Sequence, residues 1–164
     1  MKITLDTVSY SNPQDRKILQ ACFSNWFTNP KELQFTDPRM TYPFDFRKWC
    51  SLSYKDDDST SLVMKMDDWI VAYLSVKHIS ENRHVHFFHL FVDKNQRKQG
   101  FARTILNAGM KLAKELNASN ITLNAVPKNE RAIGIYKMAG FTQEGNTSSG
   151  SLIFKKNLVD RLNE

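Results

Sequence analysis

The sequence has 164 residues, of which 41% are hydrophobic and 24% charged, a composition typical of one compact globular domain and unlike that of disordered or collagen-like chains. No apolar run approaches the ~20 residues of a membrane-spanning helix, and the first residues lack the order of a signal peptide, so we expect a cytoplasmic protein. The net charge of +6 favours an anionic partner, either a nucleic acid or a polyphosphorylated small molecule.

The two cysteines, Cys22 and Cys50, form no CxxC motif and have no metal-type spacing. This argues against a disulfide framework and against a zinc site, and it agrees with a reducing compartment.

The alternation of apolar and polar residues from Ile3 to Val8 predicts a short strand with one buried face. Asn12 is a suitable N-cap and Pro13 a suitable first residue for the helix that follows, whose apolar stripe extends to Trp26. We expect this stripe to pack on the sheet.

Three prolines interrupt the segment from Thr28 to Asp45, so we expect a long loop there. Its apolar side chains suit either a lid over a pocket or a loop that they anchor to the core. Phe46 to Tyr54 predicts a second, short helix. The three aspartates at 56–58 lack the glycine and glutamate of a calcium loop, so we interpret them as a solvated turn and expect no metal.

Residues 61–66 and 69–76 predict a hairpin, and His84 to Val92 predicts a central strand because it is apolar on both faces. Helical periodicity from Ala102 to Asn117 and a strand over 121–126 complete a βαβ unit.

A further helix begins at 127–130 and ends at Gly140, and residues 141–144 and 151–155 predict a final hairpin. The tail after this hairpin is expected to be frayed or a short helical end.

The segment from Leu90 to Thr104 runs from an apolar strand through a polar loop into a helix that begins near Gly100. Such a junction exposes unpaired backbone N–H groups and carries roughly half a positive charge. Arg97, Lys98 and Arg103 add full positive charges, so we expect a phosphate or pyrophosphate to bind here.

Two motifs occur in this half of the chain, Gln96-Arg97-x-x-Gly100-x-Ala102 and Asn129-x-x-Ala132-x-x-x-Tyr136-x-x-x-Gly140-Phe141. Together they resemble the two signature segments of the GCN5-related N-acetyltransferase (GNAT) superfamily. The first is weak alone, whereas both in this order and spacing are specific. The resemblance covers roughly residues 62–156, and residues 1–61 match only in their order of elements.

The resemblance implies a single N-acetyltransferase domain over 1–164 with an α/β (α+β) fold, a mixed central sheet of about six or seven strands flanked by about four helices. Residues 1–61 would bind the acceptor and residues 62–156 acetyl-CoA. The implied coenzyme A contacts fall on Leu90, Phe91, Val92, Arg97, Lys98, Gln99, Gly100, Phe101, Ala102, Arg103, Asn124, Asn129, Ile133 and Tyr136.

Tyr136 matches the tyrosine that protonates the departing thiolate in many family members, a well-matched transfer because a phenol, like an alkyl thiol, has a pKa of ~10. The alternative is a tyrosine that packs its ring on the sheet. Asn129, at a frequent pantetheine-contacting position, is also a plausible N-cap.

The resemblance does not identify which residue acts as the general base. Asn124 stands where some members carry a glutamate, and an amide is no base. His86 falls at a second family position for the base and titrates near neutrality, although a histidine satisfied by its neighbours is the plainer alternative. His84 and His86 share a strand face and His89 points the opposite way, so we expect no metal trio.

We therefore expect an enzyme that transfers an acetyl group from acetyl-CoA to a primary amine of a small molecule or peptide, by direct attack in a ternary complex. Trp26, Phe35 and Tyr42 are the candidate acceptor-binding residues. A non-catalytic acyl-CoA-binding or sensing domain is the alternative, because a carboxylate base is missing. Nucleic-acid binding ranks last, since the basic cluster already has a phosphate target. We expect a monomer or homodimer with no membrane partner.

Overall fold

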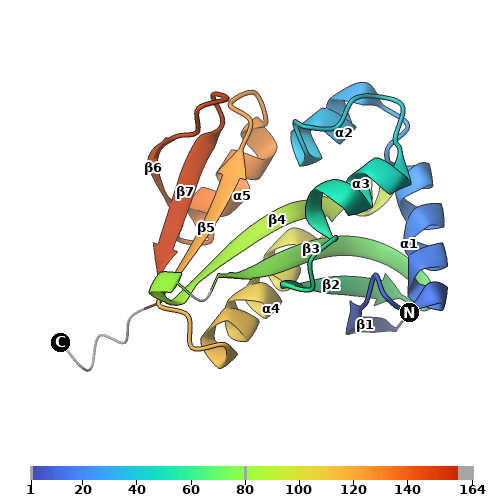
Figure 1. Ribbon diagram of the computed structural model, residues 1–164, viewed down its shortest axis with the longest axis horizontal. Helices are drawn as coiled ribbons and strands as arrows, with labels where there is room; N and C mark the ends of the chain where they lie inside the picture. The colour runs from blue at the N-terminus through green and yellow to red at the C-terminus, as the bar shows by residue number, and fades with distance from the viewer. Residues whose placement is uncertain (1, 80, 159–164) are drawn as a thin grey trace.

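The computed structural model describes residues 2–79 and 81–158, which form one seven-stranded sheet with five α-helices (Figure 1). In chain order the elements are β1 (Ile3–Val8), α1 (Pro13–Trp26), α2 (Pro30–Thr36), α3 (Phe46–Ser53), β2 (Ser59–Met66), β3 (Trp69–Ile79), the short 3₁₀ turn η1 (Glu81–Arg83), β4 (His84–Val92), the 3₁₀ turn η2 (Lys94–Gln96), α4 (Phe101–Glu115), β5 (Asn120–Ala125), α5 (Glu130–Met138), β6 (Thr142–Asn146) and β7 (Leu152–Asn157). The predicted mixed sheet is confirmed.

The strands follow the order β1-β2-β3-β4-β5-β7-β6, and every neighbouring pair is antiparallel except β4 and β5. This parallel pair is short, because only His84–Phe87 are in register with Asn120–Leu123. Past Phe87, β4 continues beside β3 as far as Val92 while β5 diverges from it, and the two strands form the arms of a V in Figure 1. The sheet is therefore open in its middle.

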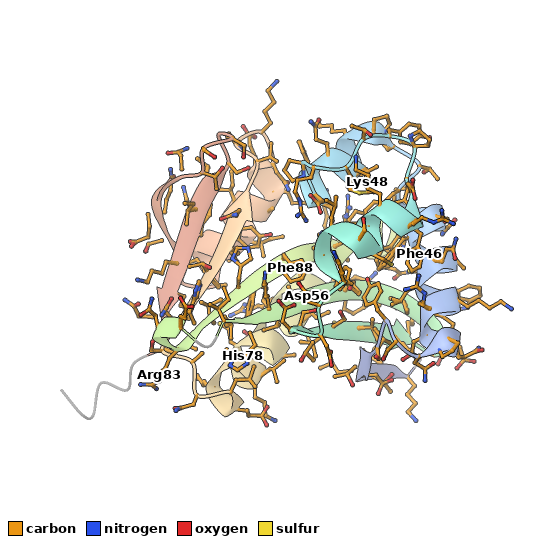
Figure 2. All side chains as sticks on the ribbon, viewed as in Figure 1. Phe46, Lys48, Asp56, His78, Arg83 and Phe88 are labelled. Atoms are coloured by element: carbon orange, nitrogen blue, oxygen red, sulfur yellow. The ribbon has the colours of Figure 1, made fainter. Side chains whose placement is uncertain are left out.

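Two hydrophobic cores lie on opposite faces of this sheet. On one face α4 and α5 pack against residues such as Leu74, Phe87 and Phe154. On the other face α1, α2 and α3 enclose a cluster rich in aromatic rings around Phe23 and Trp49. Figure 2 shows side chains filling the spaces between these helices and the sheet. Helices thus cover both faces of β4, as its apolar sequence predicted.

Two features differ from expectation: β1 has no well-buried face, and the segment after α1 contains a helix. Ile3 and Leu5 are 43% and 47% exposed, so β1 has no well-buried face; it lies at the edge of the sheet, beyond the strands that α4 covers. The predicted long loop contains α2, because Asn29 caps its N-terminus and Pro30 occupies the first turn. Proline has no backbone N–H, but an N–H in the first turn has no partner within the helix. A proline at this position therefore begins the helix rather than breaking it.

Cys22 and Cys50 are both free thiols. None of the described helices is both long enough and apolar enough to span a membrane. Among the described residues no group of histidine, cysteine and acidic side chains is suited to hold a metal ion. The expected frayed or helical tail lies, from residue 159 onward, outside the described residues.

Candidate active site

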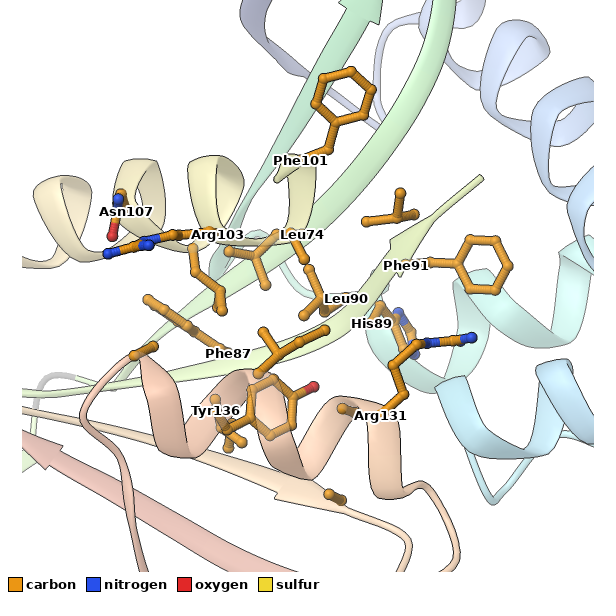
Figure 3. A pocket seen from close by; sticks show the side chains of 18 of the residues that line it. Leu74, Phe87, His89, Leu90, Phe91, Phe101, Arg103, Asn107, Arg131 and Tyr136 are labelled. Atoms are coloured by element: carbon orange, nitrogen blue, oxygen red, sulfur yellow. The ribbon is translucent and has the colours of Figure 1, made fainter. Parts of the chain in front are cut away.

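A cavity of about 940 Å³ occupies the place where β4 and β5 separate. Its walls are apolar side chains from the sheet and the two helices behind it, among them Phe87, Leu90 and Leu106 (Figure 3). One end of the cavity lies along α4 and α5, and the other reaches α2 through Glu32 and Phe35. A large apolar pocket with a few polar groups is the usual form of a small-molecule site.

The N-terminus of α4 opens onto this cavity without a side-chain cap. The other four α-helices each begin after an Asn or Asp whose side chain accepts a hydrogen bond from the first turn. The α4 N-cap is Gly100, at φ +83°, a conformation that glycine adopts without strain. The first N–H groups of α4 are thus available to an anion, as the sequence predicted for this loop.

Arg97 is engaged with α2 rather than presented as a free charge. Its guanidinium donates to both carboxylate oxygens of Glu32, at 3.0 and 3.1 Å, and to the carbonyl of Val92 at 3.1 Å. It also lies over the ring of Phe91, 5.2 Å from the centroid. Burial alone would raise the pKa of Glu32, but the hydrogen bonds and charge of Arg97 outweigh burial and lower it. The pair therefore stays ionised and joins α2 to the loop before α4.

A row of polar side chains continues from the loop along α4. Arg103, Asn107 and Lys111 recur at every fourth position, so they share one face of the helix, and all three line the cavity. Lys114, farther along α4, and Lys156, on β7 with its ammonium donating to the carbonyl of Ala139 at 2.9 Å, also line the cavity. Figure 3 shows Arg103 and Asn107 on the α4 side of the pocket. This end is suited to a ligand with several negative charges.

Tyr136 projects from α5 into the cavity, with its hydroxyl directed toward β4 (Figure 3). The residue is only 7% exposed, and burial raises its pKa well above the usual range of a phenol. The hydroxyl has no hydrogen-bond partner in the described part of the protein, and no fully sealed polar atom there lacks one, so the oxygen faces the cavity space. The ring packs near Phe141 and Phe154. Tyr136 thus combines a packed ring with a free, protonated hydroxyl.

Most of the predicted coenzyme A positions line this cavity. The lining includes Leu90, Phe91, Val92, Arg97, Lys98, Gly100, Phe101, Ala102, Arg103, Asn124, Asn129 and Tyr136. Gln99 and Ile133 are outside the lining, and the Gln99 amide donates to Gln96 instead. Asn129 also caps α5 by accepting from the backbone N–H of Ala132 at 3.3 Å, the role that the sequence left open beside ligand contact.

His86 lies away from the cavity lining. Its Nδ1 is 2.8 Å from the hydroxyl of Thr122, and burial lowers its pKa to about 4, with the nearby His84 and Lys77 acting in the same direction. A ring held in this way on the opposite face of the strand from Phe87 gives no support to the expected role of His86 as a base. The plainer reading, a histidine satisfied by its neighbours, fits the geometry.

Of the three candidate acceptor-binding residues, Phe35 alone lines the cavity. Trp26 is a core residue, 5% exposed, whose ring lies 4.9 Å from that of Phe91. Tyr42 is about half exposed, donates to the carbonyl of Thr28 at 3.2 Å and lines a separate shallow hollow. Of the predicted loop, α2 is thus the part that reaches the cavity, and the aromatic side chains around it pack in the core.

The expected orientation of His89 is wrong because β4 contains a bulge. Tyr73 is in register with Phe91 and Ser75 with Phe88, so Leu74 alone opposes His89 and Leu90. His89 has φ +60°, which turns its ring toward α3, where it stacks on Trp49 with 3.8 Å between ring centroids. A bulge of this kind interrupts the alternation on which the sequence argument relied.

The buried His89 ring connects α2 to α3. Its Nε2 is 2.7 Å from Oδ2 of Asp37 and its Nδ1 is 2.7 Å from the hydroxyl of Tyr54. Burial lowers the pKa of His89, although Asp37 acts in the opposite direction. Since an ionised carboxylate only accepts, Nε2 carries the hydrogen and the Tyr54 hydroxyl donates to Nδ1. From Tyr54 the hydrogen bonds continue through Tyr73, Ser75, Ser61 and Tyr10.

Several cavity residues were not found from the sequence. Glu32, His89 and Arg131 belong to this group, together with Lys111, Lys114 and Lys156. The spacing of Arg103, Asn107 and Lys111 is a sequence signal that identifies one helix face. Glu32 carries no comparable signal, because its partner is 65 residues away in the chain.

Comparison with known families agrees with this geometry. The model of the Acetyltransferase (GNAT) family matches residues 20–141, well over half of the chain.

Solved structures share the whole fold at low sequence identity. The GNAT domain of S. lividans PAT has a TM-score of 0.80 and 15% identity, over 94% of this chain and 89% of that one. The PaiA N-acetyltransferase of Thermoplasma acidophilum, solved with coenzyme A, gives 0.72 and 16%, over 96% and 99%. The spermidine N-acetyltransferase of Vibrio cholerae, solved with CoA and spermine, gives 0.71 and 17%, over 94% and 95%.

Proposed function

Because the chain belongs to the acetyltransferase (GNAT) family, we propose that it transfers an acetyl group from acetyl-CoA to a primary amine of a small molecule or peptide, by direct attack in a ternary complex. The observation that carries the proposal is the cavity between the diverging ends of β4 and β5, into which the hydroxyl of Tyr136 points. Because the lining extends from α4 to α2, we propose that the donor lies along α4 and that the acceptor binds at the α2 end.

The residues around the α4 end fit the donor. Coenzyme A presents a pyrophosphate and a ribose phosphate, and the uncapped α4 N-terminus with Lys98 and Arg103 suits the pyrophosphate. Lys111 and Lys114 lie farther along α4, Lys156 lines the cavity from β7, and all three suit the second phosphate. The unpaired edge of β4 past Phe87 offers backbone groups to the pantetheine arm.

When bound, acetyl-CoA supplies a thioester, whose sulfur needs a proton once the acetyl group has moved to the amine. Tyr136 is placed to donate it, because its hydroxyl is free and stays protonated at neutral pH. The burial that raises its pKa also makes it a weaker acid than the free phenol of the sequence argument, so its contribution rests on its position rather than on matched pKa values. The ring is fixed by its contacts with Phe141 and Phe154, so the hydroxyl is held in one orientation.

No side chain of the described cavity lining is suited to take the proton from the amine. Glu32, the lining's carboxylate, is held by Arg97, and both nitrogens of His89 are in hydrogen bonds. We therefore propose that the amine loses its proton to water before or during attack, and that the protein contributes positioning and exclusion of competing groups.

Tyr136→Phe tests the function and the acid role together. The variant removes one oxygen that has no partner in the described protein, so we expect a folded enzyme that still binds acetyl-CoA, with kcat lowered by about 10²-fold or more. Steady-state release of free thiol with a good amine acceptor measures kcat, and a thermal melt with coenzyme A measures binding.

Wild-type turnover in this variant would exclude Tyr136 as the acid. Sustained thiol release by the unmodified protein with any amine would exclude a domain that only binds or senses acyl-CoA.

A further inference from the structure

The charges that line the cavity are strongly unbalanced. Among the described lining residues Glu32 is the single acid, whereas seven are lysine or arginine. Five of these seven, Lys98, Arg103, Lys111, Lys114 and Lys156, belong to the α4 end. A donor with a pyrophosphate and a terminal phosphate brings roughly four negative charges, which these five side chains can balance. The two remaining cations, Arg97 and Arg131, lie near Glu32 at the α2 end.

At the α2 end one carboxylate faces two guanidinium groups. Arg97 binds both oxygens of Glu32 and is only 16% exposed, so this pair is neutral as a unit. Arg131 reaches Glu32 at 3.9 Å, and its side chain remains 53% exposed. Glu32 also feels the positive charge of Lys94. The group therefore has a net positive charge, and Arg131 carries the part of it that faces open space.

Arg131 is on the acceptor side of the gap. Figure 3 shows its side chain extending from the first turn of α5 toward His89 and Phe91, away from Arg103 and Asn107 on α4. Burial is the main cause that lowers the pKa of Arg131; repulsion from the nearby Arg97 lowers it further, and Glu32 acts in the opposite direction. An anion placed beside Arg131 relieves that repulsion and is electrostatically favoured, whereas a second cationic group is disfavoured.

The neighbouring side chains add no negative charge. Phe35, Thr36 and Phe88 are uncharged, and His89 is neutral and has both ring nitrogens in hydrogen bonds. A polyamine brings one or more cations besides its reacting amine, and nothing in the described lining of this end is free to bind them. A carboxylate, in contrast, finds a half-exposed guanidinium whose planar donors match its two oxygens.

From this arrangement we propose that the acceptor is an amine that also carries a carboxylate, and that Arg131 binds this carboxylate. The assignment rests on the proposed acetyl transfer and narrows its acceptor class. A free amino acid and a peptide with an acidic group nearby share this chemistry.

Matched acceptors test the assignment. Each of several amino acids is compared with its C-terminal amide and with the amine that lacks the carboxyl group, at saturating acetyl-CoA, with rates expressed per unprotonated amine. Dipeptides with free and amidated C-termini form a second arm that separates peptides from free amino acids. We expect the carboxylate form to be preferred at least tenfold in kcat/KM, chiefly through KM, and spermidine to be a poor acceptor.

Variants then assign the preference to one residue. Arg131→Gln should reduce the preference for the carboxylate to about twofold or less, and Arg131→Lys should restore part of it. Arg103→Gln removes the same group from the α4 end and should raise the KM for acetyl-CoA while the preference remains. Arg47→Gln removes an exposed charge of α3 outside this cavity and should change neither quantity.

The inference is overturned if amides or polyamines are used as well as carboxylates, if Arg131→Gln keeps the preference, or if that variant affects only the KM for acetyl-CoA. Acetylation of amides and polyamines leaves the proposed function intact while removing the inference. Binding of acetyl-CoA without acetylation of any amine overturns the proposed function itself, and the inference with it.

Discussion

Tyr136 and His89 lie on different sides of β4, and burial acts on both in the direction that removes charge. It raises the pKa of the phenol and lowers the pKa of the imidazole, so both groups are neutral near pH 7. The neutral phenol is a proton donor, which suits the release of a thiolate. The neutral imidazole accepts from Tyr54 and donates to Asp37, which suits a fixed structural link.

The first prediction concerns the pH dependence of turnover. Because Tyr136 stays protonated and the amine loses its proton to water, kcat/KM should rise with pH along the titration of the acceptor amine, with no decline below about pH 10. Two acceptors whose amine pKa values differ by a unit should give profiles displaced by about one pH unit. Profiles with a common midpoint near pH 6 or 7 would instead identify a side-chain base.

The second prediction concerns stability in acid. Burial alone would raise the pKa of Asp37, but hydrogen bonds from His89 and Arg39 outweigh burial and hold it well below the usual range. The pKa of His89 is lowered as well, so the unfolded chain binds more protons than the folded one below about pH 6.5. Stability from both groups is therefore present at neutral pH and is lost as the pH falls.

Asp37→Asn should lower the free energy of unfolding by about 3 kcal/mol at pH 7 and reduce its loss between pH 6 and pH 3. Urea denaturation at several pH values measures both effects. Asp57→Asn, in the exposed turn after α3, is the matched control and should leave the curve unchanged. If Asp37→Asn and the unmodified protein lose the same free energy of unfolding between pH 6 and pH 3, the assigned role of Asp37 is wrong.

At the scale of elements, α2 is held over the cavity by one ion pair and by one hydrogen bond from a neutral histidine to a carboxylate. Glu32, near its start, binds Arg97 of the loop before α4, and Asp37, just after its end, binds His89 of β4. Arg39 further fixes Asp37 through two hydrogen bonds, at 3.0 and 2.9 Å. A seven-residue helix is too short to be stable alone, so these contacts determine its position.

The third prediction compares two helical glycines that differ in their surroundings. A Cβ on Gly109 of α4 would lie 2.8 Å from Leu74 Cδ2 and 2.9 Å from Phe87 Cζ, whereas a Cβ on Gly134 of α5 meets nothing within 4 Å. Gly134→Ala should therefore raise the free energy of unfolding by about 0.5–1 kcal/mol through helix propensity.

Gly109→Ala makes the same chemical change where α4 touches the sheet. We expect it to lower the free energy of unfolding by about 1 kcal/mol, because overpacking outweighs the gain in propensity. Denaturant melts of the two variants measure the difference. If both substitutions raise the free energy of unfolding, the packing between α4 and the sheet accommodates the added methyl group without strain.

At the scale of the whole molecule, the net charge of +6 is unevenly placed around the central gap. The α4 end has five lysine and arginine side chains and no acid among its described lining residues, while the α2 end has Glu32 beside Arg97 and Arg131 and so a smaller net positive charge. The ligand of the whole domain is thus expected to be more anionic at its donor end. This local arrangement gives part of the basic charge an anionic small-molecule target.

The fourth prediction uses ligand binding as the readout of this charge distribution. Coenzyme A at about 100 times its Kd should stabilise the fold by ~2.7 kcal/mol and raise Tm by roughly 5–10 °C. At the same concentration dephospho-CoA should give a smaller shift and pantetheine a shift near zero, because they lack one or both of the phosphate groups that the α4 end is suited to bind. Equal shifts from coenzyme A and pantetheine would contradict the assignment of the phosphate sites.

Sequence alone determined those features that depend on neighbours a few residues apart. Asn12 and Asn129 accept hydrogen bonds from the first turns of α1 and α5, as the sequence predicted, whereas the equivalent signal of Asn29 and Pro30 at the start of α2 was missed. The βαβ unit with its glycine at the start of α4 and the placement of Tyr136 followed from motifs of the same short range. The family, confirmed by the match over residues 20–141, was identified on these grounds.

Tertiary structure alone decided which polar groups are free and which are paired. Arg97 meets Glu32 across 65 residues and His89 meets Asp37 across 52, separations over which a sequence carries no pairing signal. The bulge at His89 also reverses the face that strand alternation assigns to its ring. A charge available to a ligand is one that the fold leaves unpaired, and the fold leaves Arg131, rather than Arg97, half exposed beside the acceptor end.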